Sequence, residues 1–161
     1  MYVYTHGTPF RRAIEEGLLD PNRIVQLCIR GALYNGRESD WGVRQGIRVI
    51  DIDEFRSMGI ENVILEARRV VGSGRAYVTL DVDALAPVYA PGTGTPEIGG
   101  LKTIEVQAMI RGLRGLNLIG GDVVEVSPPF DPSGNTVLVA ATLMFEILCV
   151  LADNISKQKR R

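Results

Sequence analysis

Residues 77–83 read Tyr-Val-Thr-Leu-Asp-Val-Asp, a strand-like apolar stretch that runs directly into two carboxylates. Side chains alternate faces along a strand, so Asp81 and Asp83 would point the same way. Two like charges in a poorly solvated place are costly unless a cation or a shared proton relieves them. The stretch therefore predicts a divalent-cation site. The alternative is that Asp81 and Asp83 only form a turn or cap a helix.

The composition of the chain indicates one globular domain with a real core. Of its 161 residues, 45% are hydrophobic, and 18 basic and 19 acidic residues give a formal net charge of −1. The charges are well mixed until the basic residues at 157–161, so we expect no nucleic-acid partner. The only cysteines, Cys28 and Cys149, lie in apolar runs and predict buried free thiols.

The N-terminal residues lack the charged and apolar regions of a leader peptide, and no apolar run appears long enough to span a membrane. We therefore expect a cytoplasmic or matrix-like location and no membrane partner.

Strand-like and helix-like stretches alternate along the chain, without a Pro-, Gly- or Ser-rich linker between them. This alternation predicts an α/β fold, a three-layer α/β/α sandwich with a mainly parallel sheet. We expect one domain over residues 1–152 and a basic, disordered tail over 153–161. Strands are expected at 2–4, 24–30, 47–52, 77–83 and 116–126, and helices at 8–17, 54–71 (capped by Asp53), 103–113 (capped by Thr103) and 136–152, the last well buried.

Four polar residues follow or end the predicted strands: His6, Asp81, Asp83 and Glu125. Ligands of parallel sheets bind at the carboxyl ends of the strands, so these four should gather at one edge. His6 is either a structural loop residue or a group that transfers protons or binds metal. Glu125 follows apolar residues and needs a partner, which is either a cationic substrate or a basic side chain of the protein.

A loop at residues 92–95, Gly-Thr-Gly-Thr, follows the two aspartates. It lacks the residue spacing of the phosphate-binding motifs, which disfavours a phosphate cradle. We expect instead that its glycines supply backbone angles that let the loop pass close to the site.

Three stretches of the sequence resemble the ureohydrolase family, which includes agmatinase, guanidinobutyrase, proclavaminate amidinohydrolase and the more distant arginases. They are residues 4–13 (YTHGTPFRRA), 79–101 (TLDVDALAPVYAPGTGTPEIGGL) and 122–129 (DVVEVSPP). The resemblance spans nearly the whole chain. The details HGTPFRR and APGTGT are more similar to agmatinase-like members than to arginases.

The resemblance implies an arginase/deacetylase-like fold and a centre of two manganese ions that share a hydroxide. In the family this hydroxide attacks a small guanidino substrate, such as agmatine or guanidinobutyrate, and releases urea and an amine. By resemblance, Asp81 would bridge the two metals and Asp83 would chelate one of them. His6 would shuttle protons and Glu125 would hold the guanidinium, so both would contact substrate. A homo-oligomer and a role in polyamine metabolism are also implied.

The sequence departs from the family in two ways. The family's motifs Gly-Gly-Asp-His-Ser and Asp-Ala-His-x-Asp are absent, so the chain corresponds to the C-terminal portion, without the N-terminal strands and most metal ligands. An apolar sheet edge should then be exposed. Ala86 also stands where the family usually has Asp. The sequence therefore predicts an agmatinase-like amidinohydrolase that is incomplete in this chain. The alternative is a non-catalytic remnant that packs against a partner chain.

Overall fold

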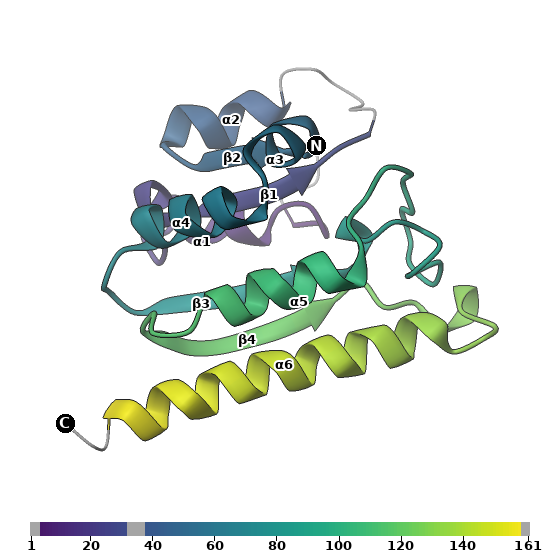
Figure 1. The fold of residues 1–161 in the computed structure, drawn as a ribbon. Helices are drawn as coiled ribbons and strands as arrows, with labels where there is room; N and C mark the ends of the chain where they lie inside the picture. The colour runs from purple at the N-terminus through teal and green to yellow at the C-terminus, as the bar shows by residue number, and fades with distance from the viewer. Residues whose placement is uncertain (1–3, 32–37, 159–161) are drawn as a thin grey trace.

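The computed structural model describes residues 4–31 and 38–158 (Figure 1). The elements in chain order are α1 Pro9–Glu15, η1 Pro21–Arg23, β1 Val25–Ile29, α2 Glu38–Gln45, β2 Arg48–Asp51, α3 Ile52–Met58, α4 Ile60–Val71, β3 Ala76–Asp81, η2 Val82–Ala84, α5 Thr103–Gly112, β4 Leu118–Val124, η3 Pro128–Phe130 and α6 Asn135–Gln158.

The strands form two parallel pairs, which confirms the parallel pairing expected from the sequence. Strand β1 pairs with β2, and β3 pairs with β4 so that Asp81 lies opposite Val124. Figure 1 shows the strands in the order β2, β1, β3, β4 from top to bottom. Among the described residues no ladder joins β1 to β3, so each of these strands has an edge without a strand partner.

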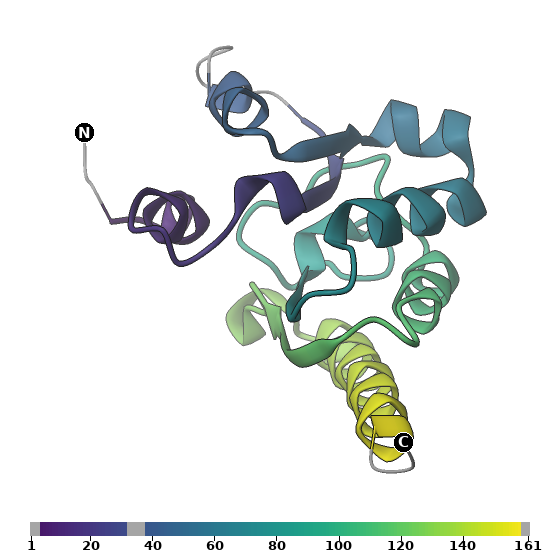
Figure 2. The ribbon, with the colours of Figure 1, turned by 90° about the vertical axis from the view of Figure 1, so that its left-hand side faces the viewer.

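Helices lie on both sides of the strands, as a three-layer fold requires. Figure 2 shows α1 on one side and α3, α4 and α5 on the other, with α6 running beneath β4. One cluster of buried apolar residues joins the two sheets to α3, α4, α5 and α6. Its fully buried members include Ile50, Val63, Val82, Leu85, Leu101, Val106, Leu143 and Ile147.

The region expected as one helix at 54–71 is two helices. Gly59 has a φ of +75°, a conformation that glycine adopts at little cost, and it separates α3 from α4. The cap of α3 is Asp51 rather than the expected Asp53, because Asp51 Oδ1 accepts a hydrogen bond of 2.8 Å from the Glu54 amide. The N-cap position of α5 is likewise Lys102 and not the expected Thr103, which is the first residue of the helix.

Both ends of the described chain differ from expectation. Tyr4 lies in a bend rather than a strand, and the other residues of the strand expected at 2–4 are outside the described residues. Helix α6 continues to Gln158, so residues 153–158 of the expected tail are helical, while 159–161 are not described. Of the two free cysteines, Cys28 is buried as expected but Cys149 is exposed.

Helix α6 is not well buried, which contradicts the expectation from its composition. Large apolar side chains stay exposed along it, Leu138 at 67% and Phe145 at 64%. They belong to the α6 stripe, which repeats at the three- and four-residue spacing of a helix–helix seam: Leu138, Ala141, Phe145, Leu148, Ala152 and Ile155.

The apolar length of α6 also overturns the expectation that no run could span a membrane. The helix from Asn135 to Lys157 is long enough and apolar enough to cross a membrane, judged by length and composition alone. Length and composition alone do not indicate a membrane, because the core helix of a soluble protein has the same properties. Leu143, Ile147 and Val150 of this helix are in fact buried in the protein core.

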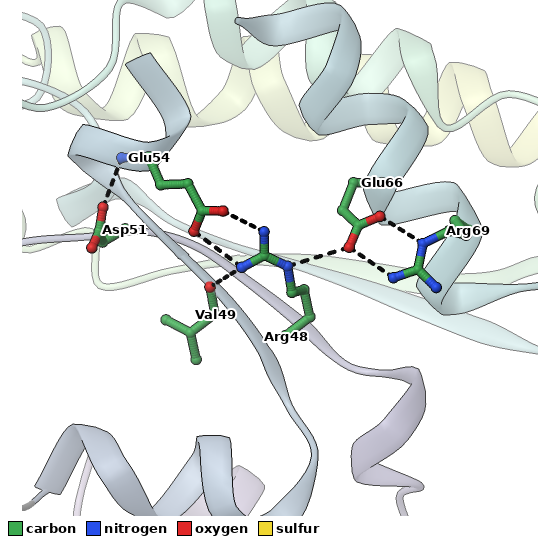
Figure 3. Close-up of polar contacts among 6 residues, drawn as sticks. All are labelled: Arg48, Val49, Asp51, Glu54, Glu66 and Arg69. Atoms are coloured by element: carbon green, nitrogen blue, oxygen red, sulfur yellow. Dashed lines mark hydrogen bonds and ion pairs between the residues drawn. The ribbon is translucent and has the colours of Figure 1, made fainter. Parts of the chain in front are cut away.

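A network of charged side chains joins β2 to the two helices that follow it (Figure 3). The Arg48 guanidinium binds Glu54 of α3 and, through Nε at 3.2 Å, Glu66 of α4. Glu66 also accepts hydrogen bonds of 2.6 and 2.8 Å from Arg69 one turn further along. Because Arg48 reaches both helices, the network fixes their positions relative to the strand.

We predict that Glu66 makes stability depend on pH below 4.5. Hydrogen bonds from Arg69 and then Arg48 lower the pKa of Glu66 from 4.5 to about 2. A carboxylate whose pKa is lowered by folding stabilises the protein at pH values above its pKa in the unfolded state. This stability is lost as the pH falls from 4.5 toward about 2. Glu66→Gln should therefore lower the urea midpoint at pH 7 but little near pH 2.

The matched control is Glu61→Gln on the same helix, outside the network, which should change the midpoint little at either pH. Equal losses for Glu66→Gln at pH 7 and near pH 2 would show that the charge of Glu66 does not contribute.

Candidate functional site

Asp81 and Asp83 lie together at the carboxyl end of β3, but not for the reason expected. The strand ends at Asp81, and the 3-10 turn η2 follows, so strand alternation does not apply to Asp83. Asp81 Oδ1 accepts a hydrogen bond of 2.8 Å from the Asp83 amide. The capping role considered from the sequence is therefore real for Asp81, and the turn brings the second carboxylate close to the first.

The pKa of Asp81 is raised to about 6, chiefly by burial of its carboxyl group. The like charges of Asp83 and Glu125 raise it further, while the Asp83 amide and the Arg30 guanidinium lower it. This carboxylate is therefore held in its charged form at a cost near neutral pH, and a bound cation would reduce that cost.

The Asp83 carboxylate receives two hydroxyl groups from the loop predicted to approach the site. Thr93 Oγ1 donates to one carboxylate oxygen and Thr95 Oγ1 to the other. Thr93 is buried, whereas Thr95 is exposed. The loop thus orients Asp83 through its threonines.

Gly92 explains why this loop can lie so close to the rest of the site. A Cβ at Gly92 would lie 2.3 Å from Cβ of Asp131. Its amide donates to the buried Thr136 hydroxyl at 2.8 Å, and its carbonyl accepts from the Ser127 amide at 2.8 Å. The close approach expected of the glycines holds at Gly92, but it depends on the missing Cβ and not on an unusual backbone angle, because Gly92 does not have a positive φ. At Gly94 a Cβ would meet open space, so no such constraint applies there.

His6 and Glu125 meet beside the two aspartates. His6 Nδ1 lies 3.1 Å from Glu125 Oε1, and the His6 side chain is 91% exposed. Glu125 directly follows β4, and its neighbour Val124 is paired with Asp81. The four residues singled out from the sequence are therefore brought together at the carboxyl ends of β3 and β4. The partner of Glu125 in this structure is a histidine rather than a lysine or arginine.

Arg30 is a residue of the site that the sequence reasoning missed. It follows β1, and its guanidinium donates to four backbone carbonyls of the loop after β3: Asp83 at 2.6 Å, Glu97 at 2.7 Å, Leu85 at 3.1 Å and Ile98 at 3.1 Å. An arginine at the end of an apolar strand was the available clue, because a partly buried guanidinium requires acceptors. Arg30 thereby fastens β1 to the loop that contains Asp83.

The oxygen donors of Asp81 and Asp83 are the type that manganese and magnesium prefer. However, within residues 4–31 and 38–158 no three His, Cys, Asp or Glu residues are grouped so that they could hold a metal ion. The residues present fit part of a metal centre, and further ligands are needed to complete one.

We predict that Asp81→Asn stabilises the metal-free chain at pH 7.5. The asparagine retains an acceptor for the Asp83 amide but removes a charge that burial disfavours. A raised carboxylate pKa contributes stability below 3.8 that is lost as the pH rises through about 6. The gain should therefore appear above pH 6 and vanish near pH 4. The carboxyl group of Asp81 is partly desolvated, but the residue as a whole is exposed, so solvent keeps the gain in stability below the ~1.4 kcal/mol per pKa unit of a fully buried group.

The measurement is the urea midpoint of both proteins at pH 4 and pH 7.5, with Asp53→Asn on the exposed surface of α3 as the control. A lower midpoint for Asp81→Asn at pH 7.5 would contradict the electrostatic account.

Comparisons with known proteins identify the family. Residues 2–150 match the arginase family. The chain is 60% identical over 154 residues to the guanidinopropionase of Pseudomonas aeruginosa. The matched region covers 96% of this chain and 48% of the relative. It is 49% identical to the mitochondrial agmatinase of Gallus gallus, over 91% of this chain and 42% of that protein.

A solved structure agrees with these sequence relatives. The proclavaminate amidinohydrolase of Streptomyces clavuligerus superposes with a TM-score of 0.89 at 41% identity, over 94% of this chain and 50% of that one. The chain spans about half the length of the curated relatives it matches. The resemblance to ureohydrolases is confirmed, and the chain belongs to the arginase family.

Proposed function

We propose that this chain contributes part of the active site of an amidinohydrolase that converts a guanidino compound to urea and an amine. The observation that carries the proposal is the cluster at the ends of β3 and β4. There the His6–Glu125 contact of 3.1 Å lies beside the Asp81–Asp83 turn. Family membership supports the same reaction class.

Each of the four residues has a role that suits its chemistry. The carboxylates of Asp81 and Asp83 would hold manganese, which would acidify a water molecule and stabilise developing negative charge. Glu125 accepts paired hydrogen bonds from the planar guanidinium of the substrate. His6 is exposed beside Glu125 and transfers a proton to the departing amine.

A guanidino carboxylic acid is the substrate class to test first. The chain is 60% identical to a guanidinopropionase and 51% identical to a guanidinobutyrase of Pseudomonas aeruginosa. Its identity to the agmatinases is lower, 49% for that of Gallus gallus and 42% for that of Escherichia coli. Agmatine, the substrate class expected from the sequence motifs, is the second candidate.

The site needs a second set of ligands, and we infer that a further polypeptide segment of the same family supplies them. Two carboxylates are fewer than a divalent ion of this kind requires. The chain also covers only about half of each relative. In its complete form we expect a cytoplasmic homo-oligomer that acts on a small molecule.

A non-catalytic role as a packing subunit is the second candidate. It is favoured by the exposed α6 stripe and by the unpaired edges of β1 and β3 among the described residues. The two candidates differ in what a partner does: it completes the metal site in the first and only covers apolar surface in the second.

Complementation separates these candidates. We predict that the chain alone, with stoichiometric manganese, releases no measurable urea from 3-guanidinopropionate, 4-guanidinobutyrate or agmatine. Co-expression with the part of the Pseudomonas guanidinopropionase that has no counterpart here should yield a complex that releases urea. A stable complex with bound manganese but no urea from any of the three compounds would reject the catalytic proposal.

Variants of the active complex test the assigned roles. We predict that Asp81→Ala costs more activity than His6→Ala, because the first removes a metal ligand. Losing a proton-transfer group costs a factor of about 10²–10⁴, part of which buffer can restore. Manganese affinity and urea release are measured together, with Asp53→Ala as the control. Asp81→Ala that still binds two manganese ions tightly would remove this residue from its proposed role.

Ala86 offers a test in the opposite direction. It lies in the loop fastened to the site, where its amide donates to the Leu101 carbonyl at 2.9 Å. We predict that Ala86→Asp raises manganese affinity by roughly the 10–100-fold that is typical of groups supporting metal ligands. Unchanged or weaker binding in isothermal titration would show that Ala86 is no defect of this site.

A further inference from the structure

Thr93 lies between two acidic residues of the site, Asp83 and Glu125. Its side chain is 2% exposed, and its Oγ1 contacts both a carboxylate oxygen of Asp83 and, at 2.9 Å, the backbone carbonyl of Glu125. We propose that Thr93 is a positioning residue that couples the Asp83 carboxylate to the backbone of Glu125. The functional meaning of this coupling rests on the proposed function, in which Asp83 binds metal and Glu125 binds the guanidinium.

Glu125 needs such support because of its backbone conformation. Its φ is +64°, in the left-handed region that non-glycine residues seldom adopt. Such a conformation persists only where the surrounding structure holds it. Thr93 binds the carbonyl of Glu125, and two residues later the Ser127 amide donates to the Gly92 carbonyl at 2.8 Å. The loop therefore fastens the end of β4 at two neighbouring points.

The hydroxyl group of Thr93 makes the two contacts interdependent. It carries a single hydrogen, while an ionised Asp83 carboxylate and the Glu125 carbonyl are both acceptors. The hydrogen can be given fully to only one of them, and a charged carboxylate is the stronger acceptor. A cation that draws charge from Asp83 would free the hydrogen for Glu125. By linkage, a better-fixed Glu125 would favour the cation in return.

Thr95 provides the matched control. Its hydroxyl donates to the other oxygen of Asp83, but the contact to Glu125 belongs to Thr93. Replacing either threonine by valine removes one hydroxyl from Asp83 at nearly constant shape. Only Thr93→Val also removes the tie to Glu125. Thr93→Ser keeps the hydroxyl and should restore the coupling.

The first experiment uses the metal-free chain and measures amide hydrogen exchange at Ser127. Thr93→Val should speed this exchange by about twofold to threefold, the low end of the effect of one net hydrogen bond, because Asp83 competes for the same hydrogen in the metal-free chain. Thr93→Ser and Thr95→Val should leave it near the wild-type rate, and the remote Val63 amide should be unchanged in all variants. Equal rates for Thr93→Val and wild type, or equal acceleration by the two valine variants, would overturn the proposal.

The wild-type chain decides the question if Thr93→Val does not fold. A buried, hydrogen-bonded hydroxyl gives a resolved and slowly exchanging proton signal in the NMR spectrum. We expect such a signal for Thr93, and a rapidly exchanging Thr93 hydroxyl would overturn the proposal.

The second experiment uses the complemented complex. Thr93→Val should weaken manganese binding and raise KM for the guanidino substrate, whereas Thr95→Val should weaken manganese binding alone. The same KM in both valine variants would overturn the coupling. If the wild-type complex binds manganese but releases no urea, the proposed function fails, while the exchange experiment still decides the role of Thr93.

Discussion

The crowding of three carboxylates at the ends of β3 and β4 is the constraint on which the rest of the site depends. Burial and the neighbouring charges of Asp83 and Glu125 raise the pKa of Asp81 to about 6. The surroundings accordingly present donors to each acidic group. An amide faces Asp81, two hydroxyls face Asp83, and the His6 ring faces Glu125. These contacts position the carboxylates but add no full positive charge between the aspartates, which leaves the attraction for a cation intact.

Arg30 shows how the scaffold stabilises this cluster without neutralising it. Its guanidinium binds backbone carbonyls rather than the carboxylates, so it holds the loop in place from outside. Strand β1 reaches it through a register shift at Cys28, whose φ is +66°. Such bulges redirect side chains near functional sites. A lysine would lose at least one of these contacts, because its single nitrogen cannot take the places of both Nη2, which donates to Asp83, Leu85 and Glu97, and Nε, which donates to Ile98.

The sequence predicted the place of the site because the carboxyl ends of parallel strands share an edge, which holds for Asp81, Glu125 and their neighbours whatever the loops do. The roles of Arg30 and Thr93 were not predicted from the sequence, since their contacts depend on the path of a loop that no residue spacing specifies. Asp83 was placed correctly for a wrong reason, because a capped turn replaced strand alternation. The exposure of α6 could not be predicted from its composition. An apolar residue such as Phe145 gives the same sequence signal whether its side chain is buried or, as here, exposed.

If the proposed partner segment both supplies metal ligands and covers the exposed apolar surface of α6, assembly and completion of the site are one step. Fully burying a large apolar side chain is worth about 1.5–3 kcal/mol, so covering residues such as Leu138 and Phe145 would supply much of the association energy. A segment that also brings metal ligands would have its binding coupled to the ion, because only the assembled form offers a full coordination shell. Manganese would then stabilise the complex, and the complex would raise the affinity for manganese by the same factor. Packing alone predicts an association that is indifferent to the ion, so the dependence of assembly on manganese distinguishes a completed active site from a covered apolar face.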